Sequence, residues 1–174
     1  MVTHQKTWTF LLLDCGKVER VRPFEPRDHD VCLALLASNT PEFFAPQEQA
    51  DYVRFLRTHQ ETYFVLERDG EVVACGGVAL FPDDAAGMQL DVNSAGLTWG
   101  MVRRDLHAQG IGTALLEARL GWLRTHAPQV REVRLATSQF TTEYYARRGF
   151  QVRHVTRDGF APGVDAIEMR RVIK

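Results

Sequence analysis

Near the middle of the chain, a strand-like run leads through two glycines into a long helical pattern. The run "LTWGMVR", residues 97–103, is typical of a strand, and Gly110 and Gly112 follow after a short loop. Apolar residues then recur at helical spacing until Pro128 ends the pattern. A second strand pattern, "VREVRLATS", comes next. The stretch 97–138 therefore predicts a strand–helix–strand unit.

Patterns on either side of this unit also alternate between strand and helix. Asp69-Gly70 and Cys15-Gly16-Lys17 each separate two extended stretches, which predicts a hairpin at each place. The order of patterns predicts a mixed α/β fold. The other expected elements are strands at 8–14, 18–24, 62–67, 71–81, 150–158 and 164–173, and helices at 28–39, 47–59 and 141–148.

Composition excludes several classes of protein. The 174 residues, 45% of them apolar, suffice for one domain, 1–174, with a single core. A net charge of −1 lacks the basic excess of a nucleic-acid binder. The apolar run "WTFLLL" is far shorter than the roughly 20 residues that span a membrane. Cys15, Cys32 and Cys75 have no metal or redox spacing, so we expect buried, reduced thiols in a soluble cytoplasmic protein.

The two glycines suggest an anion site. The first N–H groups of a helix are unpaired and carry partial positive charge, so small residues there let a phosphate approach the backbone. An isolated Gly-x-Gly can equally serve only to turn the chain. Two other phosphate motifs are excluded, because Thr113-Ala114 replaces the Lys-Ser/Thr of a Walker loop and Leu115 replaces the third glycine of a dinucleotide fingerprint.

The stretch "MVRRDLHAQGIGTALL" resembles the acyl-coenzyme A binding motif of the GNAT superfamily of N-acetyltransferases. In that motif a Val-x-Pro strand end leads into Gln/Arg-x-x-Gly-x-Gly/Ala. Val102, Gly110 and Gly112 match it, with the spacing of the family. Arg104 replaces the proline and His107 replaces the Gln/Arg, but neither change removes a backbone donor.

A second stretch, "TSQFTTEYYARRGF", resembles the family's Asn-x-x-Ala-x-x-(Phe)-Tyr-x-x-x-Gly-Phe element. Tyr145, Gly149 and Phe150 are in register, whereas Ser138 replaces the asparagine and Thr141 the alanine. The resemblance implies the GNAT fold: a central, mostly antiparallel sheet of six to seven strands with a βαβ core and about four helices. Residues 1–17 would supply an extra N-terminal strand.

The resemblance also implies a cofactor site for acetyl-coenzyme A, used as co-substrate. The loop at 108–113 would bind the pyrophosphate, and the splayed fourth core strand would offer free backbone groups to the pantetheine arm. No histidine shows metal-ligand spacing, so we expect no metal. The residues carried over for the cofactor are Gly100, Met101, Val102, His107, Ala108, Gln109, Gly110, Ile111, Gly112, Thr113 and Ser138.

Tyr145 matches the family's tyrosine that protonates the leaving thiolate, although it could also be a core aromatic beside Tyr144. No carboxylate lies on the "LTWGMV" strand; Glu42, Glu48 and Asp91 are candidates for a general base acting through water, although each could also be an ordinary surface carboxylate.

The resemblance further implies that the acceptor site lies between the early helices and the last hairpin. Its predicted substrate contacts are Phe43, Phe44 and Glu48. Phe160 would add an apolar surface, and the carboxylates of Glu42, Asp158 and Asp165 would favour a cationic amine.

We therefore expect an N-acetyltransferase that moves an acetyl group by direct attack of a primary amine on a small molecule or peptide. It would act as a monomer or homodimer, without nucleic acid or membrane. The first alternative is a non-catalytic acyl-coenzyme A binding or regulatory module on the same fold. The second, a nucleotide-binding protein, is disfavoured by the missing lysine and third glycine.

Overall fold

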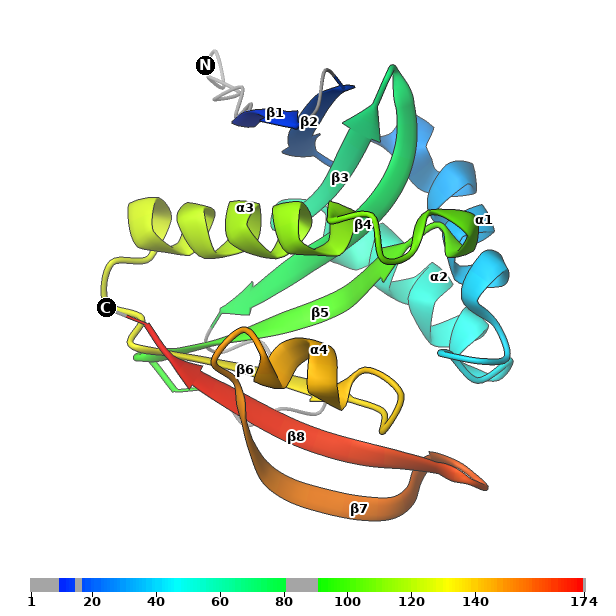
Figure 1. Ribbon diagram of the computed structural model, residues 1–174, viewed down its shortest axis with the longest axis vertical. Helices are drawn as coiled ribbons and strands as arrows, with labels where there is room; N and C mark the ends of the chain where they lie inside the picture. Colours follow the sequence, from blue (N-terminus) through cyan, green and yellow to red (C-terminus); the bar gives the residue numbers. More distant parts are fainter. Residues whose placement is uncertain (1–9, 15–16, 81–90, 174) are drawn as a thin grey trace.

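The computed structural model describes residues 10–14, 17–80 and 91–173 (Figure 1). Its strands are β1 (Phe10–Asp14), β2 (Lys17–Pro23), β3 (Tyr63–Arg68), β4 (Glu71–Leu80), β5 (Ser94–Val102), β6 (Glu132–Thr137), β7 (Gln151–Ala161) and β8 (Val164–Val172). Its helices are α1 (His29–Asn39), α2 (Glu48–Thr58), α3 (Ile111–His126) and α4 (Thr142–Ala146), with short 3₁₀ turns at Pro26–Asp28 and Arg104–Leu106.

The strands form one mixed sheet in the order β1-β2-β3-β4-β5-β6-β8-β7. Every neighbouring pair is antiparallel except β5 and β6, which are parallel and joined through α3. The predicted α/β class, the mostly antiparallel sheet and the central βαβ unit are therefore confirmed. Strand β1 is the additional N-terminal strand, and with it the described sheet has eight.

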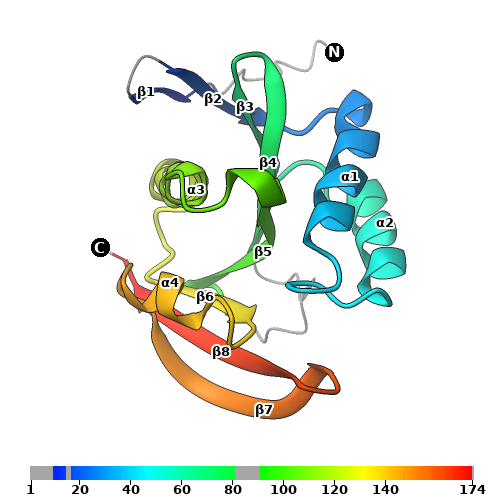
Figure 2. The ribbon, with the colours of Figure 1, turned by 45° about the vertical axis from the view of Figure 1, so that its right-hand side comes forward.

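Helices cover both faces of the sheet. Figure 2 shows α1 and α2 on one face and α3 on the other, with α4 beside β6. Each face has its own core. One contains Leu115 and Leu120 of α3, and the other contains Leu35 of α1 and Leu56 of α2. None of the helices in the described ranges is long and apolar enough to cross a membrane.

The apolar residues of the two early helices are not all buried. In α1 the buried residues include Cys32 but not Val31, which is only half-buried. In α2, Phe55 is buried whereas Ala50 is exposed. Helix α1 carries apolar residues on most of its sides, so the pattern alone does not determine its rotation. Cys32 and Cys75 are buried free thiols, as expected, and Cys15 lies outside the described residues.

The βαβ unit contains the features that create a cleft. Strands β5 and β6 pair only between Ser94–Gly96 and Glu132–Arg134 within their described lengths. The remainder of β5, residues 97–102, therefore presents its edge to open space instead of to a neighbouring strand. The register with β4 also shifts between Cys75 and Gly77, and opposite this shift Trp99 adopts a φ of 43°. The chain thus bulges at the centre of the cleft.

Candidate active site

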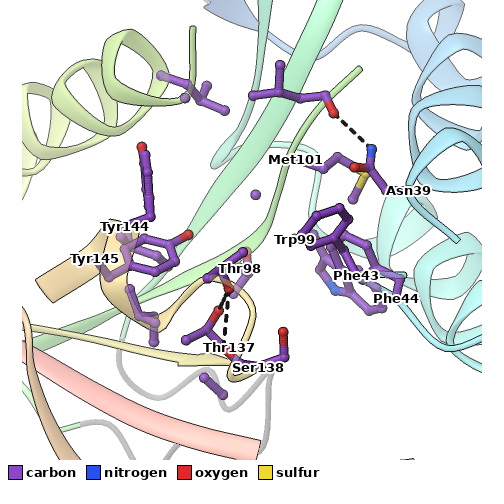
Figure 3. A pocket seen from close by; sticks show the side chains of 18 of the residues that line it. Asn39, Phe43, Phe44, Thr98, Trp99, Met101, Thr137, Ser138, Tyr144 and Tyr145 are labelled. Atoms are coloured by element: carbon purple, nitrogen blue, oxygen red, sulfur yellow. Dashed lines mark hydrogen bonds between the residues drawn. The ribbon is translucent and has the colours of Figure 1, made fainter. Parts of the chain in front are cut away.

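A cleft of about 960 Å³ opens where β5 and β6 diverge. Figure 3 shows its two sides, with Tyr144 and Tyr145 of α4 facing Trp99, Phe43 and Phe44 across the gap. The β5 edge forms the floor between them, and the N-terminus of α3 lies at one end. Elements that are distant in the sequence therefore meet around one elongated cavity.

The loop before α3 has unpaired backbone N–H groups at the place where the glycine motif predicts an anion site. Ala108 and Gly110 have φ values of 62° and 84°, and Gly110 is the N-cap of the helix. The N–H groups of residues 108–112 donate to no atom in the described parts of the chain. Successive unpaired N–H groups at a helix N-terminus form a site for an anionic group.

Space beside this loop depends on Gly112. A Cβ atom there would lie 3.1 Å from the Tyr144 hydroxyl. Ala108, Gly110, Gly112 and Thr113 line the cleft, whereas Gln109 and Ile111 do not. Ile111 is buried in the core, and the Gln109 side chain accepts a hydrogen bond of 3.0 Å from Arg68. These two residues can therefore face a bound anion only with their backbone N–H groups.

The end of β5 is held in place by side chains from two other segments. The carbonyl oxygen of Val102 accepts a hydrogen bond of 2.8 Å from the Asn39 amide, drawn in Figure 3. The His107 Nε2 atom lies 3.0 Å from the same oxygen, and the His107 ring packs edge-on against Phe43. Gly100, Met101 and Val102 all line the cleft, as does His107, which braces the strand end.

Helix α4 places two tyrosines on the cleft wall. Figure 3 shows the Tyr145 hydroxyl directed into the cleft towards β5, and its ring packs edge-on against Phe150. Tyr144 turns towards Gly112 in the first turn of α3, and burial raises the pKa of Tyr144. Arg148 lies 3.7 Å from the centre of the Tyr144 ring and donates to the Thr113 hydroxyl. Ser138, before α4, is buried and also lines the cleft.

The side of the cleft that faces α4 is mainly aromatic. Phe43 and Phe44 line the cleft, as the sequence predicts, and Phe44 stacks on Trp99 at 6.1 Å. Phe160 joins them from the last hairpin. Near them, Glu48 accepts a hydrogen bond of 2.6 Å from the Ala45 N–H, and desolvation raises the pKa of its carboxyl group.

The other predicted carboxylates are directed elsewhere. Glu42 forms an exposed ion pair of 2.7 Å with Arg104, and Asp91 is exposed and outside the cleft lining. Asp158 and Asp165 accept hydrogen bonds from backbone N–H groups of their own hairpin and do not line the cleft. Of the candidate bases, the structure brings only Glu48 to the cavity.

Sequence reasoning did not identify several residues of the lining. They include Asn39, Thr98, Trp99, Arg119, Tyr144 and Arg148. The Thr98 hydroxyl and the Arg148 Nε are buried without a hydrogen-bond partner among the described residues. Only Arg119 carries a clear sequence signal, because it interrupts the otherwise apolar stripe of Leu115 and Leu123.

Comparison with known proteins agrees with this geometry. Residues 32–150, more than half of the chain, match the family model described as Acetyltransferase (GNAT) family, so the chain belongs to that acetyltransferase family. No curated protein sequence matches it.

Solved structures show the same fold. Ard1 from Thermoplasma volcanium is 19% identical with a TM-score of 0.72, covering 90% of this chain and 98% of its own. The ribosomal-protein-S18-alanine N-acetyltransferase from Escherichia coli is 21% identical with a TM-score of 0.68, covering 90% and 94%. Rv2747 from Mycobacterium tuberculosis, solved with coenzyme A, is 20% identical with a TM-score of 0.65, covering 88% and 99%.

Proposed function

We propose that this acetyltransferase moves the acetyl group of acetyl-coenzyme A directly onto a primary amine of a small molecule or peptide. The observation that carries the proposal is the position of the Tyr145 hydroxyl. It points towards the unpaired edge of β5 within a cleft that ends at the unpaired N–H groups of residues 108–112. An anion cradle, a backbone edge and a proton donor therefore share one cavity.

The cleft fits the two ends of coenzyme A. The N–H groups of the loop suit a pyrophosphate, and Gly112 leaves room beside the helix for it to approach. The edge of β5 supplies unpaired backbone groups at residues 97–102, which suit the amides of a pantetheine arm. Arg148, with its buried and unpaired Nε, stands beside the loop as a further donor to phosphate.

Tyr145 acts as the general acid. A phenol is protonated at neutral pH, so it can give its proton to the thiolate that departs when the carbon–sulfur bond breaks. Its ring is fixed by Phe150, while its hydroxyl remains on the cleft side. Tyr144 is less suited to this step because it faces the phosphate loop.

Glu48 serves as the general base, receiving through water the proton that the amine must lose before attack. An alkylammonium group has a pKa near 10.4, so deprotonation is required at neutral pH. Partial burial raises the pKa of Glu48 and makes its carboxylate a stronger base than an exposed one. It lies in the same aromatic part of the cleft as Phe43 and Phe44.

The names of two structural neighbours suggest which amines to test. Ard1 and the ribosomal-protein-S18-alanine N-acetyltransferase share the fold, and the second name specifies an alanine of a ribosomal protein. The aromatic wall of Phe44 and Trp99 would pack against an apolar part of such an acceptor. Glu48, which lines the cleft, would attract its positive charge.

The test is release of the coenzyme A thiol from acetyl-coenzyme A in the presence of defined amines. The panel comprises peptides with different N-terminal residues, polyamines, amino acids and aminoglycosides. The proposal predicts acceptor-dependent thiol release together with an N-acetylated product of the expected mass. Tight coenzyme A binding without turnover on any acceptor would instead favour a binding or regulatory module.

A further inference from the structure

Arg119 is a buried cation in the donor half of the cleft. It lies on α3, only 3% of its surface is exposed, and it forms part of the cleft lining. Its neighbours along the same face of the helix, Leu115 and Leu123, are buried apolar residues. A guanidinium at this position must be compensated by hydrogen bonds or by an opposite charge.

Its bonding differs from that of the other buried arginines. Arg22 pairs with Asp28 and Glu67, and Arg68 pairs with Glu19. Arg119 has no carboxylate partner among residues 10–14, 17–80 and 91–173.

Its hydrogen bonds are also weak. The Nε atom lies 3.4 Å from the Leu115 carbonyl oxygen, and Nη1 lies 3.4 Å from that of Gly77. Both distances exceed those of a good N–H···O bond. Nη2 donates to no atom in the described ranges. Most of the hydrogen-bonding capacity of this guanidinium is therefore unused.

The guanidinium of Arg119 lies against two glycines of the sheet, Gly76 and Gly100. A Cβ atom at Gly76 would come within 2.9 Å of Nη1, and one at Gly100 would come within 3.1 Å of both Nη atoms. Gly100 belongs to the free edge of β5, directly after the bulge at Trp99. The charge is therefore held against the strand that is proposed to bind the pantetheine arm, whose end carries the thioester.

The phosphates of coenzyme A do not provide the missing anion. Arg119 follows Gly112 by seven residues on the same helix, which places it about 10 Å further along the axis at 1.5 Å per residue. A pyrophosphate at the N-terminus of α3 would lie two turns away. At the depth of Arg119, a negative charge can come from the acyl group of the donor.

We propose that the cleft accepts acyl-coenzyme A donors whose acyl chain ends in a carboxylate, such as malonyl or succinyl thioesters, and that Arg119 binds this carboxylate. Planar guanidinium groups match carboxylates in geometry and are more weakly hydrated than ammonium groups. The inference rests on the proposed acyl transfer and follows the same chemistry. The amine nitrogen bonds to the thioester carbon, the carbon–sulfur bond breaks, and the thiolate takes a proton.

The experiment compares donor affinities by calorimetric titration without an acceptor. Succinyl- and malonyl-coenzyme A are compared with butyryl- and acetyl-coenzyme A, since butyryl has the carbon number of succinyl without its charge. We expect the carboxylated donors to bind the wild type roughly 10- to 100-fold more tightly than the neutral ones, the range of a hydrogen bond between charged groups.

Three variants connect this preference to the residue. Arg119→Met removes the charge and should reduce the preference to about twofold or less, whereas Arg119→Lys keeps the charge and should retain part of it. Arg124→Met, at an exposed arginine of the same helix, should leave the ratio unchanged. If Arg119→Met does not fold, the wild-type ratio and the lysine variant decide the question.

Two results would overturn the inference. One is equal affinity of the wild type for succinyl- and butyryl-coenzyme A. The other is an equal loss for all donors and for coenzyme A itself in Arg119→Met, because Arg119 would then bind the pantetheine arm. Acetyl transfer to an amine without any donor preference would leave the proposed function intact. Tighter binding of carboxylated donors without turnover on any amine would refute the proposed function, while Arg119 would still be the binding site for the carboxylate.

Discussion

The hydroxyl of Tyr63 donates a hydrogen bond of 3.0 Å to the main-chain carbonyl of Trp99, the residue at which β5 bulges with a φ of 43°. A bulky residue rarely adopts this conformation unless its surroundings hold it there. Tyr52 in turn lies 2.7 Å from the Tyr63 hydroxyl, and burial raises the pKa of both phenols, so they stay protonated. Across a trans peptide the Gly100 N–H points the opposite way from the Trp99 carbonyl, towards the α3 side of the cleft.

Tyr63→Phe should therefore lower turnover and stability together. The variant leaves the partly buried Trp99 carbonyl without its donor, which costs about 1 kcal/mol in the free energy of unfolding. Relaxation of the bulge would also move the Gly100 N–H. Steady-state kinetics and thermal unfolding are compared with Tyr52→Phe, which keeps the bond to Trp99. An equal loss of stability in both variants, with turnover unchanged in each, would show that the bulge is maintained without Tyr63.

Gly112→Asp should abolish coenzyme A binding while the protein remains folded. The new side chain would begin 3.1 Å from the Tyr144 hydroxyl, a group that can shift, and would place a negative charge in the anion cradle. An acidic residue in the first turn favours the helix itself. Isothermal titration and circular dichroism of the variant measure the two effects separately. If the folded variant binds coenzyme A with wild-type affinity, the loop at residues 108–113 does not bind the cofactor.

Coenzyme A should raise the melting temperature in proportion to the logarithm of its concentration, and pantetheine should do so poorly. A ligand that binds only the folded state stabilises it by mass action, and the unpaired N–H groups of residues 108–112 are expected to bind the phosphates. Thermal unfolding with both ligands at matched concentrations provides the comparison. Equal protection would mean that the phosphates contribute no affinity.

Glu48 should impose a pH dependence on both activity and stability. As a base it must be ionised, so the rate should fall as the pH decreases through its raised pKa, and Glu48→Gln should lose most of the rate. Its folded-state pKa lies above the unfolded one, so its contribution to stability is present below the unfolded pKa and is lost as the pH rises through the folded pKa. The glutamine variant should lack this dependence.

The control for this prediction is Glu42→Gln, at the exposed glutamate that pairs with Arg104 outside the cleft. It should retain the wild-type rate and pH profile. If both glutamine variants keep the wild-type profile, another group or bulk water removes the amine proton.

The sequence predicted those parts of the structure that depend on local pattern. Gly110 and Gly112 predict the start of α3. Gly110 is the N-cap and has a positive φ, which glycine adopts readily, and Gly112 lies in a first turn with little space for a side chain. The hairpin β3-β4 and the strand–helix–strand unit β5-α3-β6 likewise follow from local patterns, at Asp69-Gly70 and at residues 97–138. In contrast, β5 starts at Ser94, earlier than expected, and β7 continues to Ala161.

Contacts between segments that are distant in the chain could not be predicted from local sequence patterns. The bulge at Trp99 depends on Tyr63, which is 36 residues earlier in the chain. The neighbours of a carboxylate determine whether it lies in the cleft. Glu42 forms an ion pair with Arg104 outside the cleft, whereas Glu48 accepts a hydrogen bond from the Ala45 N–H at the cleft. Such partners are determined by tertiary packing and leave no periodic signal in the sequence.

The turnover of Tyr145→Phe, measured once an acceptor is known, tests whether Tyr145 is the proton donor. The substitution keeps the ring packed on Phe150 and removes only the hydroxyl. We expect kcat to fall by about 10²-fold, the low end for a positioned general acid because a thiol is a good leaving group, with the affinity for acetyl-coenzyme A unchanged. Tyr144→Phe, which removes the hydroxyl near Gly112, should alter affinity rather than kcat. Wild-type turnover in Tyr145→Phe, or a loss confined to cofactor affinity, would contradict the assignment of Tyr145 as the proton donor.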